Sequence, residues 1–172
     1  FTAYRIPDKT TRESKILDMV STYLSDGNSS KLYRKLVDEQ KMSLQVAAFN
    51  ISLEEYGMYV ILTLPLGETS LASLRDEIDE EIEKIQTNLI SQKDYEKLLN
   101  KFESNFVSSN ASVEGIANSL AEYYIFYDDT NLINSEIDIY RSITREEIRD
   151  VAKKYLNSNQ RLTLNYLPGS KK

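Results

Sequence analysis

The sequence contains no cysteine and no histidine. Without cysteine it cannot form a disulfide, a thiolate zinc site or a cysteine nucleophile. Without histidine it lacks the most common metal ligand and the usual general base near neutral pH. A serine or threonine nucleophile paired with histidine is excluded for the same reason. From the residues alone we therefore predict no catalytic and no metal-binding residue in this chain.

Positive charge and long apolar runs are also scarce. The chain has 21 Lys and Arg residues against 27 Asp and Glu residues, a net charge of -6. This balance argues against a nucleic-acid partner, which requires a positive surface. No run of about 18 apolar residues occurs, so we expect no membrane span. We expect a soluble protein, cytoplasmic or periplasmic, and the sequence leaves the compartment open.

The length of 172 residues suits one domain, and no linker, repeat or low-complexity segment interrupts it. The sequence begins at Phe1, without methionine and already in a strand-like pattern. Our expectation is that residues 1–172 form a single domain excised from a longer multi-domain chain.

Hydrophobic periodicity predicts an α+β fold. Alternating or β-branched segments predict strands at 1–6, 42–53, 56–66 and 161–167, the last ending at Pro168. Helical spacing predicts one helix after a capping box at Thr10 and Glu13, one from Ser29 or Ser30, and four between 69 and 156, the last after a second capping box at Thr144 and Glu147. Distant strands must meet in one sheet. The expected architecture is a mixed β-sheet with α-helices packed on it.

The turn between the first two predicted helices admits two interpretations. A helix N-terminus can bind an anion, but residues 26–30 lack the glycine spacing and the lysine of a phosphate loop. Gly27 is a typical residue at the C-terminal end of a helix, and Ser29 and Ser30 are typical helix N-caps. We therefore favour a structural joint over a ligand loop.

The acidic run at 75–84 also has two interpretations. Its carboxylates could bind a hard cation, but such sites need oxygen ligands that converge from a loop or several elements. Here an apolar stripe of Leu74, Ile78, Ile82 and Ile85 lies on the opposite helix face. A solvated helix face is the better explanation.

The stretch LDMVSTYLSDGNSSKLYRKLVDEQKMSLQVAAF, residues 17–49, resembles the metal-free domain of the pitrilysin/insulinase family of zinc peptidases. The mitochondrial processing peptidase belongs to that group. The marker turn is carried by Gly27, Ser29, Ser30 and Leu32. Segments 91–106, 143–156 and 161–168 resemble, in order, a later helix, the closing helix and the terminal strand of the family. The resemblance implies the α+β fold that these domains share.

In that family an inverted His-x-x-Glu-His motif and a distant glutamate hold zinc, which activates water for peptide hydrolysis. Because this chain has no histidine, the resemblance implies a domain without cofactor, and zinc is expected in a partner domain. The implied partners are the metal-bearing domain, on the same or a partner chain, and an unfolded peptide substrate held in a chamber between the domains.

One departure from the family pattern concerns substrate contacts. Active members often carry an arginine and, seven residues later, a tyrosine that contact substrate near the zinc. The matching positions here are Val37 and Leu44, neither of which donates a side-chain hydrogen bond. The first hypothesis is a non-catalytic domain of a zinc metalloendopeptidase. The alternatives are a catalytically inactive scaffold subunit of the same fold, or an unrelated interaction domain with a different sheet topology.

Overall fold

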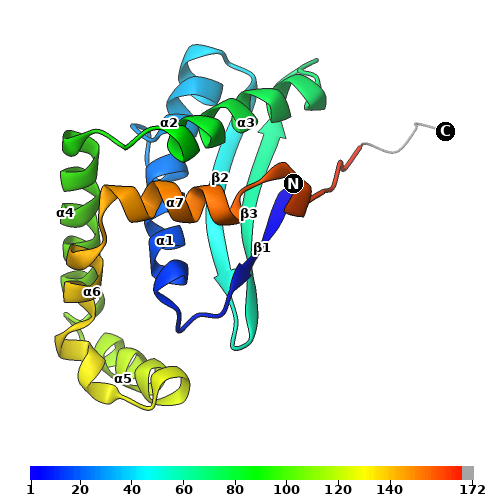
Figure 1. Ribbon diagram of the computed structural model, residues 1–172. Coiled ribbons are helices and arrows are strands. Elements are labelled where there is room, and N and C mark those ends of the chain that lie inside the picture. Colours follow the sequence, from blue (N-terminus) through cyan, green and yellow to red (C-terminus); the bar gives the residue numbers. More distant parts are fainter. Residues whose placement is uncertain (168–172) are drawn as a thin grey trace.

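The computed structural model describes residues 1–167 as one four-stranded sheet with helices on one face (Figure 1). The strands are β1 (Thr2–Pro7), β2 (Ser43–Ser52), β3 (Tyr56–Pro65) and β4 (Arg161–Thr163). The α-helices are α1 (Arg12–Ser25), α2 (Lys31–Tyr33), α3 (Leu71–Thr87), α4 (Gln92–Ser109), α5 (Val113–Tyr127), α6 (Glu136–Ser142) and α7 (Arg145–Tyr155). A π-helix, η1 (Arg34–Glu39), and two 3₁₀ turns, η2 (Thr130–Asn134) and η3 (Ser158–Gln160), complete the described elements.

The strand order is β2-β3-β1-β4, and each neighbouring pair is antiparallel. The α+β class with helices on the sheet is therefore confirmed, but the sheet is not mixed. β1 and β2 run in the same direction, since both pair antiparallel with β3. No parallel pair forms between them because β3 lies in the middle.

The predicted strand boundaries hold best in the hairpin of β2 and β3, where they differ from the structure by about one residue. The last strand is shorter than predicted and ends at Thr163. Backbone pairing nevertheless continues one residue further, because the Leu164 N–H donates to the Phe1 carbonyl at 2.9 Å. The predicted stop at Pro168 lies outside the described residues.

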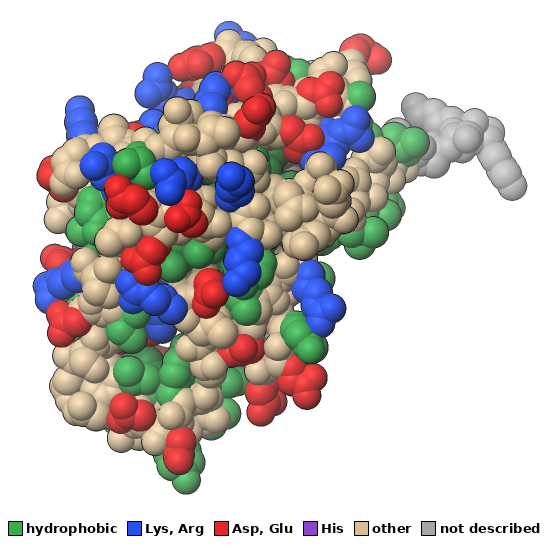
Figure 2. Space-filling model, in the orientation of Figure 1, with side chains coloured by type: hydrophobic (Ala, Val, Ile, Leu, Met, Phe, Trp, Pro, Cys, Tyr) green, Lys and Arg blue, Asp and Glu red, His purple; other side chains and the backbone are tan. Residues whose placement is uncertain are grey.

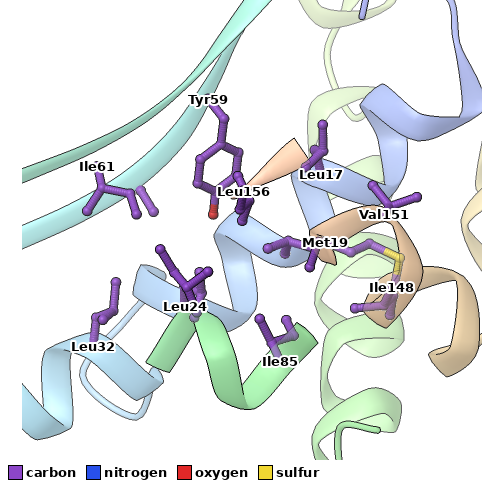
Figure 3. Packing of buried hydrophobic residues seen from close by; sticks show 14 of the residues in the cluster. Leu17, Met19, Leu24, Leu32, Tyr59, Ile61, Ile85, Ile148, Val151 and Leu156 are labelled. Carbon is purple, nitrogen blue, oxygen red and sulfur yellow. The ribbon is translucent and has the colours of Figure 1, made fainter. Parts of the chain in front are cut away.

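The core lies between the sheet and the helices that cover it. Tyr4 and Tyr59 lie on neighbouring strands with their rings edge to face, 6.4 Å between centroids. They pack against the apolar stripe of α1 and against α7 and α3 (Figure 3). The other fully or almost fully buried members of the core include Leu17, Met19, Leu24, Leu32, Ile61, Ile85, Ile148 and Leu156. The period-2 pattern of the strands and the period-3.6 pattern of the helices thus meet in one layer.

Of the two predicted capping boxes, the structure contains one. The capping box at Thr144 and Glu147 is present in both directions. The predicted box at Thr10 and Glu13 is wrong: Thr11 is the N-cap, and its hydroxyl accepts from the Ser14 N–H at 3.2 Å. Asp8 explains the shift by one residue, since its carboxylate accepts from both the N–H and the hydroxyl of Thr10.

Candidate functional site

The marker turn lies between α1 and α2. Gly27 has φ +82°, the left-handed conformation that a glycine adopts without strain after a helix end. The Ser30 N–H donates back to the Gly27 carbonyl at 3.0 Å, and Leu32 is fully buried in the core. Ser30 is the N-cap residue of α2, but its buried hydroxyl has no hydrogen-bond partner among the described residues.

Lysines around this turn are already paired. Lys31 binds Asp94 at 3.0 Å and Lys101 binds Asp26 at 2.5 Å, while Lys97 donates to the Ser29 hydroxyl. The hollow that these residues share has a volume of about 30 Å³. That volume is enough to hold a water molecule. These contacts hold the turn against α4.

The positions of the missing arginine and tyrosine lie on either side of the next bend. Val37 belongs to η1 and packs, half-buried, against the core. Leu44 lies early in β2, beside the bulge between Ser43 and Gln45, and its side chain is 57% exposed. Lys41 between them has φ +52°. The structure therefore places one of these residues toward the interior and the other toward the surface, and neither supplies a polar group.

The acidic run on α3 is less solvated than predicted. Lys35 of η1 approaches Glu77, Glu80 and Glu81 at 2.8, 2.6 and 3.4 Å. Burial lowers the pKa of Lys35, but its hydrogen bonds to these glutamates outweigh burial and raise the pKa above its ordinary value. The Lys35 bond in turn lowers the pKa of Glu80 to about 2. The run thus holds η1 in place.

The carboxylates of α3 face basic side chains of other elements. Among residues 1–167 no group of three or more His, Cys, Asp or Glu side chains is placed to hold a metal ion. Glu77, Glu80 and Glu81 are instead paired with Lys35, and Asp79 is paired with Arg161 of β4 at 2.5 Å. The acidic run therefore connects three elements of the fold by ion pairs.

A buried polar network joins α1 to α5 and α6. Lys15 pairs with Glu136 at 2.6 Å, and the Tyr123 hydroxyl donates to the second Glu136 oxygen, also at 2.6 Å. Beside it, Asp18 accepts from the Asn50 amide at 2.8 Å and from the Tyr140 hydroxyl at 3.3 Å. Burial raises the pKa of Asp18 to about 6, although Lys15 opposes this shift.

This network was not predicted from the sequence. Buried groups with displaced pKa values are candidates for functional sites. Here, however, the charged atoms face one another and hold α5 and α6 against α1. The signal available in the sequence was the position of Lys15 beside Ile16 and Leu17 on the buried side of α1.

The outer face of the sheet, away from the helices, carries a continuous set of exposed apolar side chains. We call it the outer sheet face; its members are Phe1, Phe49, Ile51, Met58, Leu62, Leu64, Leu162 and Leu164, each between 37% and 66% exposed. The opposite, helix-covered face differs: Figure 2 shows acidic and basic side chains intermingled over it. An apolar patch of this kind marks an interaction surface. None of the described helices is long and apolar enough to cross a membrane.

Comparisons with known proteins agree with the fold. The chain is 24% identical over 161 residues to the zinc protease PqqE of Helicobacter pylori. The matched region covers 94% of this chain and 36% of that protein. The chain thus spans little more than a third of that relative.

Two solved structures share the fold. A protease from Helicobacter pylori superimposes with a TM-score of 0.86 and 22% identity, over 93% of this chain and 38% of the other. The inactive peptidase domain from Bordetella parapertussis superimposes with a TM-score of 0.82 and 22% identity, over 99% and 91%. Residues 2–102, more than half of the chain, match the family described as the peptidase M16 inactive domain. The chain therefore belongs to the inactive-domain family of the M16 peptidases, the group to which pitrilysin and insulinase belong.

Proposed function

We propose that this chain is the metal-free domain of a longer zinc metalloendopeptidase, where it packs against the metal-bearing domain and forms part of the wall of a peptide-holding chamber. Zinc belongs to the partner domain in this proposal, and the chain itself performs no chemistry. The observation that carries the proposal is an inactive-domain fold whose outer sheet face is left apolar and exposed.

The outer sheet face has the composition of an interface and not of a solvated surface. Met58, Leu62 and Leu64 lie along β3, with Phe49 on the neighbouring β2 and Leu162 on β4. Removing such side chains from water contributes about 25 cal/mol per Å² of apolar area. Between them Val60 and Ala3 are already buried, so the patch has a packed centre and an exposed rim. A second domain that covers this face would stabilise both partners.

The free edge of β2 bears on how a peptide substrate could bind. The Ser25 hydroxyl at the end of α1 accepts from the Ala48 N–H at 2.6 Å and donates to the Ala48 carbonyl at 3.1 Å. The middle of this edge is therefore occupied, and a strand could pair there only if Ser25 moved away. We infer that the domain contributes surface and orientation to a bound peptide, without adding it to the middle of β2.

The scaffold alternative is supported by Val37 and Leu44. Both positions that carry polar substrate contacts in active relatives are apolar here. An intact His-x-x-Glu-His motif in the metal-bearing partner domain would favour the peptidase, and its absence would favour the scaffold.

The proposal is tested by binding to the separately produced metal-bearing domain of the parent protein. We expect association, and a loss of affinity of about tenfold or more when Leu62→Lys places a charge on the outer sheet face. Val107→Lys is the matched control, because Val107 is an exposed apolar residue on α4, 68% exposed and away from the sheet. Equal effects of the two substitutions would contradict the proposed interface.

Zinc and peptidase assays complete this test. The isolated chain should show no stoichiometric zinc binding at submicromolar affinity in calorimetry, because it has neither histidine nor cysteine ligands. It should also show no peptide hydrolysis alone. Chelator-sensitive cleavage by the purified chain would overturn the assignment.

A further inference from the structure

α5 presents an apolar stripe to solvent. Val113, Ile116 and Tyr124 are exposed, and Leu120 is half-buried between them. Because these residues follow one another at spacings of three or four, their side chains lie along one side of the helix. Figure 1 shows α5 at the end of the row of helices, away from the sheet. We call this set the α5 stripe; an exposed stripe of this kind is typical of a helix that packs against a partner.

The charge around the α5 stripe has one sign. Residues 102–140 contain seven acidic residues and no lysine or arginine, so they account for the whole negative net charge of the chain. Cations from outside this segment pair with four of the seven, namely Glu103, Glu122, Glu136 and Asp138. Glu114, Asp128 and Asp129 have no ion-pair partner among residues 1–167. Figure 2 shows acidic and apolar side chains, but no basic one, at the lower end of the molecule where α5 lies.

The three unpaired carboxylates lie at the two ends of the stripe. Glu114 is in the first turn of α5, whereas Asp128 and Asp129 directly follow its last residue, Tyr127. A carboxylate is favoured at the positive N-terminal end of a helix and disfavoured at the negative C-terminal end. The last turn of α5 contains no basic residue that would offset this effect. A cation supplied by a partner would therefore be favourable above all beside Asp128 and Asp129.

A groove opens on the adjacent side of α5, between α5, α4 and α6. It has a volume of about 230 Å³ and is lined by the aromatic side chains of Phe102, Phe106 and Tyr123 and by the carboxylates of Glu122 and Glu136. None of the described residues that line it is basic. A lysine or arginine packs its alkyl stem against aromatic walls and pairs its charged end with a carboxylate. The groove therefore suits one basic side chain of a partner.

The charges and the helical backbone restrict what can cover the α5 stripe. A second copy of α5 would bring its own carboxylates against Glu114, Asp128 and Asp129, and like charges repel. An anionic bilayer is disfavoured for the same reason. The backbone N–H and C=O groups of α5 bond within the helix, so an added strand would find no backbone partner there. A second helix, in contrast, can fit its side-chain ridges into the grooves between those of α5.

We propose that the α5 stripe binds a basic amphipathic helix of a partner polypeptide. The apolar side of that helix covers Val113, Ile116, Leu120 and Tyr124. Its lysine or arginine residues pair with the carboxylates at the two ends of α5, and one of them enters the groove beside Tyr123. This surface is separate from the outer sheet face, and the proposal does not rest on the proposed function.

The experiment measures binding of the 172-residue chain to three fluorescently labelled peptides of about 18 residues, slightly longer than α5. The first is a helical peptide with leucine along one side and lysine elsewhere. The second has glutamate in place of every lysine, and the third has serine in place of every leucine. We expect the leucine-lysine peptide to bind at least about tenfold more tightly than either of the others, because both apolar contact and positive charge are required.

Two neighbouring substitutions locate the binding site. Tyr124→Ser removes an exposed member of the stripe and should weaken binding of the leucine-lysine peptide by about tenfold. Ile125→Ser is the matched control, because Ile125 is also an exposed apolar residue of α5 but lies about 100° further round the helix. This control should leave the affinity unchanged. Asp128→Asn combined with Asp129→Asn should weaken binding several-fold, since Asn keeps the shape of both side chains and removes their charge.

Several outcomes would overturn the inference. Equal binding of the lysine and glutamate peptides would show that charge does not select the partner. Equal effects of Tyr124→Ser and Ile125→Ser would show that the α5 stripe is not the site. Binding to vesicles of phosphatidylcholine and phosphatidylglycerol, without binding to the leucine-lysine peptide, would show a membrane surface instead. Leu62→Lys on the outer sheet face should leave the affinity for the peptide unchanged, so this test and the test of the proposed function fail separately.

Discussion

The sheet layer and the arm formed by α4, α5 and α6 are held together by different chemistry. In the sheet layer, α1 alone buries seven residues, most of them apolar, against the strands and α7. In the arm, α5 buries only Tyr123, although its sequence is mostly apolar. Val113, Tyr124 and Ile125 of α5 are 86%, 65% and 69% exposed. Figure 1 shows α5 at the end of the arm, away from the sheet.

The contrast teaches that apolar composition did not determine which helix is buried. α5 is held by the pair of Lys15 and Glu136, by Tyr123, and by the Tyr127 hydroxyl, which donates to the Lys9 carbonyl at 3.0 Å. A buried polar network of this kind depends on all its members, because each unpaired charge in a low-dielectric site is strongly unfavourable. Removal of one polar side chain should therefore loosen the arm and leave the sheet layer intact.

The largest expected effect is in the sheet layer. Leu17→Ala removes a fully buried side chain from the core and should lower the free energy of unfolding by about 2–5 kcal/mol. Urea denaturation measures this change. Val113→Ala on α5 is the matched control and should remain within about 0.5 kcal/mol of the parent chain. Similar losses from both substitutions would show that α5 is buried in solution.

A smaller but more local effect is expected in the arm. Lys15→Met keeps an apolar stem in the site and leaves the partly buried Glu136 carboxylate without its cation, at a loss of about 1–3 kcal/mol. Amide exchange should accelerate in α5 and α6 and remain slow in β1 and β3. Adding Glu136→Leu to Lys15→Met should restore part of the loss, because no unpaired charge then remains. Uniform acceleration over the whole chain would mean that the arm and the sheet layer unfold as one unit.

The sheet layer was also the region that the sequence predicted well. Alternation in β2 and β3 and the helical stripe of α1 each depend on apolar residues spaced by the period of their own element. The turn at Gly27 followed from local backbone chemistry, as did the box at Thr144. The capping box at Thr10 was predicted wrongly because the Asp8 carboxylate accepts hydrogen bonds from the N–H and the hydroxyl of Thr10. The Thr10 hydroxyl therefore does not cap the helix.

The arm and its polar network could not be predicted because they depend on neighbours that are distant in sequence. Lys15 lies 121 positions from Glu136, and Lys35 lies 42 positions from Glu77. From the sequence alone, a buried lysine or aspartate on α1 cannot be distinguished from a solvated one. The sheet is antiparallel throughout because β3 lies between β1 and β2. The hydrophobic periodicity and the length of each strand do not determine this order.

The smallest expected effect has the opposite sign and concerns Asp18. Burial raises its pKa in the folded protein to about 6, against an ordinary value of 3.8. Between these two pH values the folded chain binds more protons at Asp18 than the unfolded chain does. The contribution of Asp18 to stability is therefore fully present below about pH 4 and is lost as the pH rises through about 6. The groups that face Asp18 are Lys15, Asn50, Glu136 and Tyr140.

Asp18→Asn removes the titration without changing the shape of the side chain. At pH 7.5 the substitution should stabilise the chain by about 1–2 kcal/mol, less than the full linkage value because the bonds from Asn50 and Tyr140 lose a charged acceptor. At pH 4 the gain should disappear, since Asp18 is then protonated in the folded chain. Asp38→Asn, at an exposed position on η1, is the matched control for the change of side chain. Equal destabilisation by Asp18→Asn at both pH values would contradict this prediction. It would mean that the hydrogen bonds of the Asp18 carboxylate stabilise the arm more than burial of its charge destabilises it. The polar network would then tolerate a buried charge that the apolar sheet layer would not.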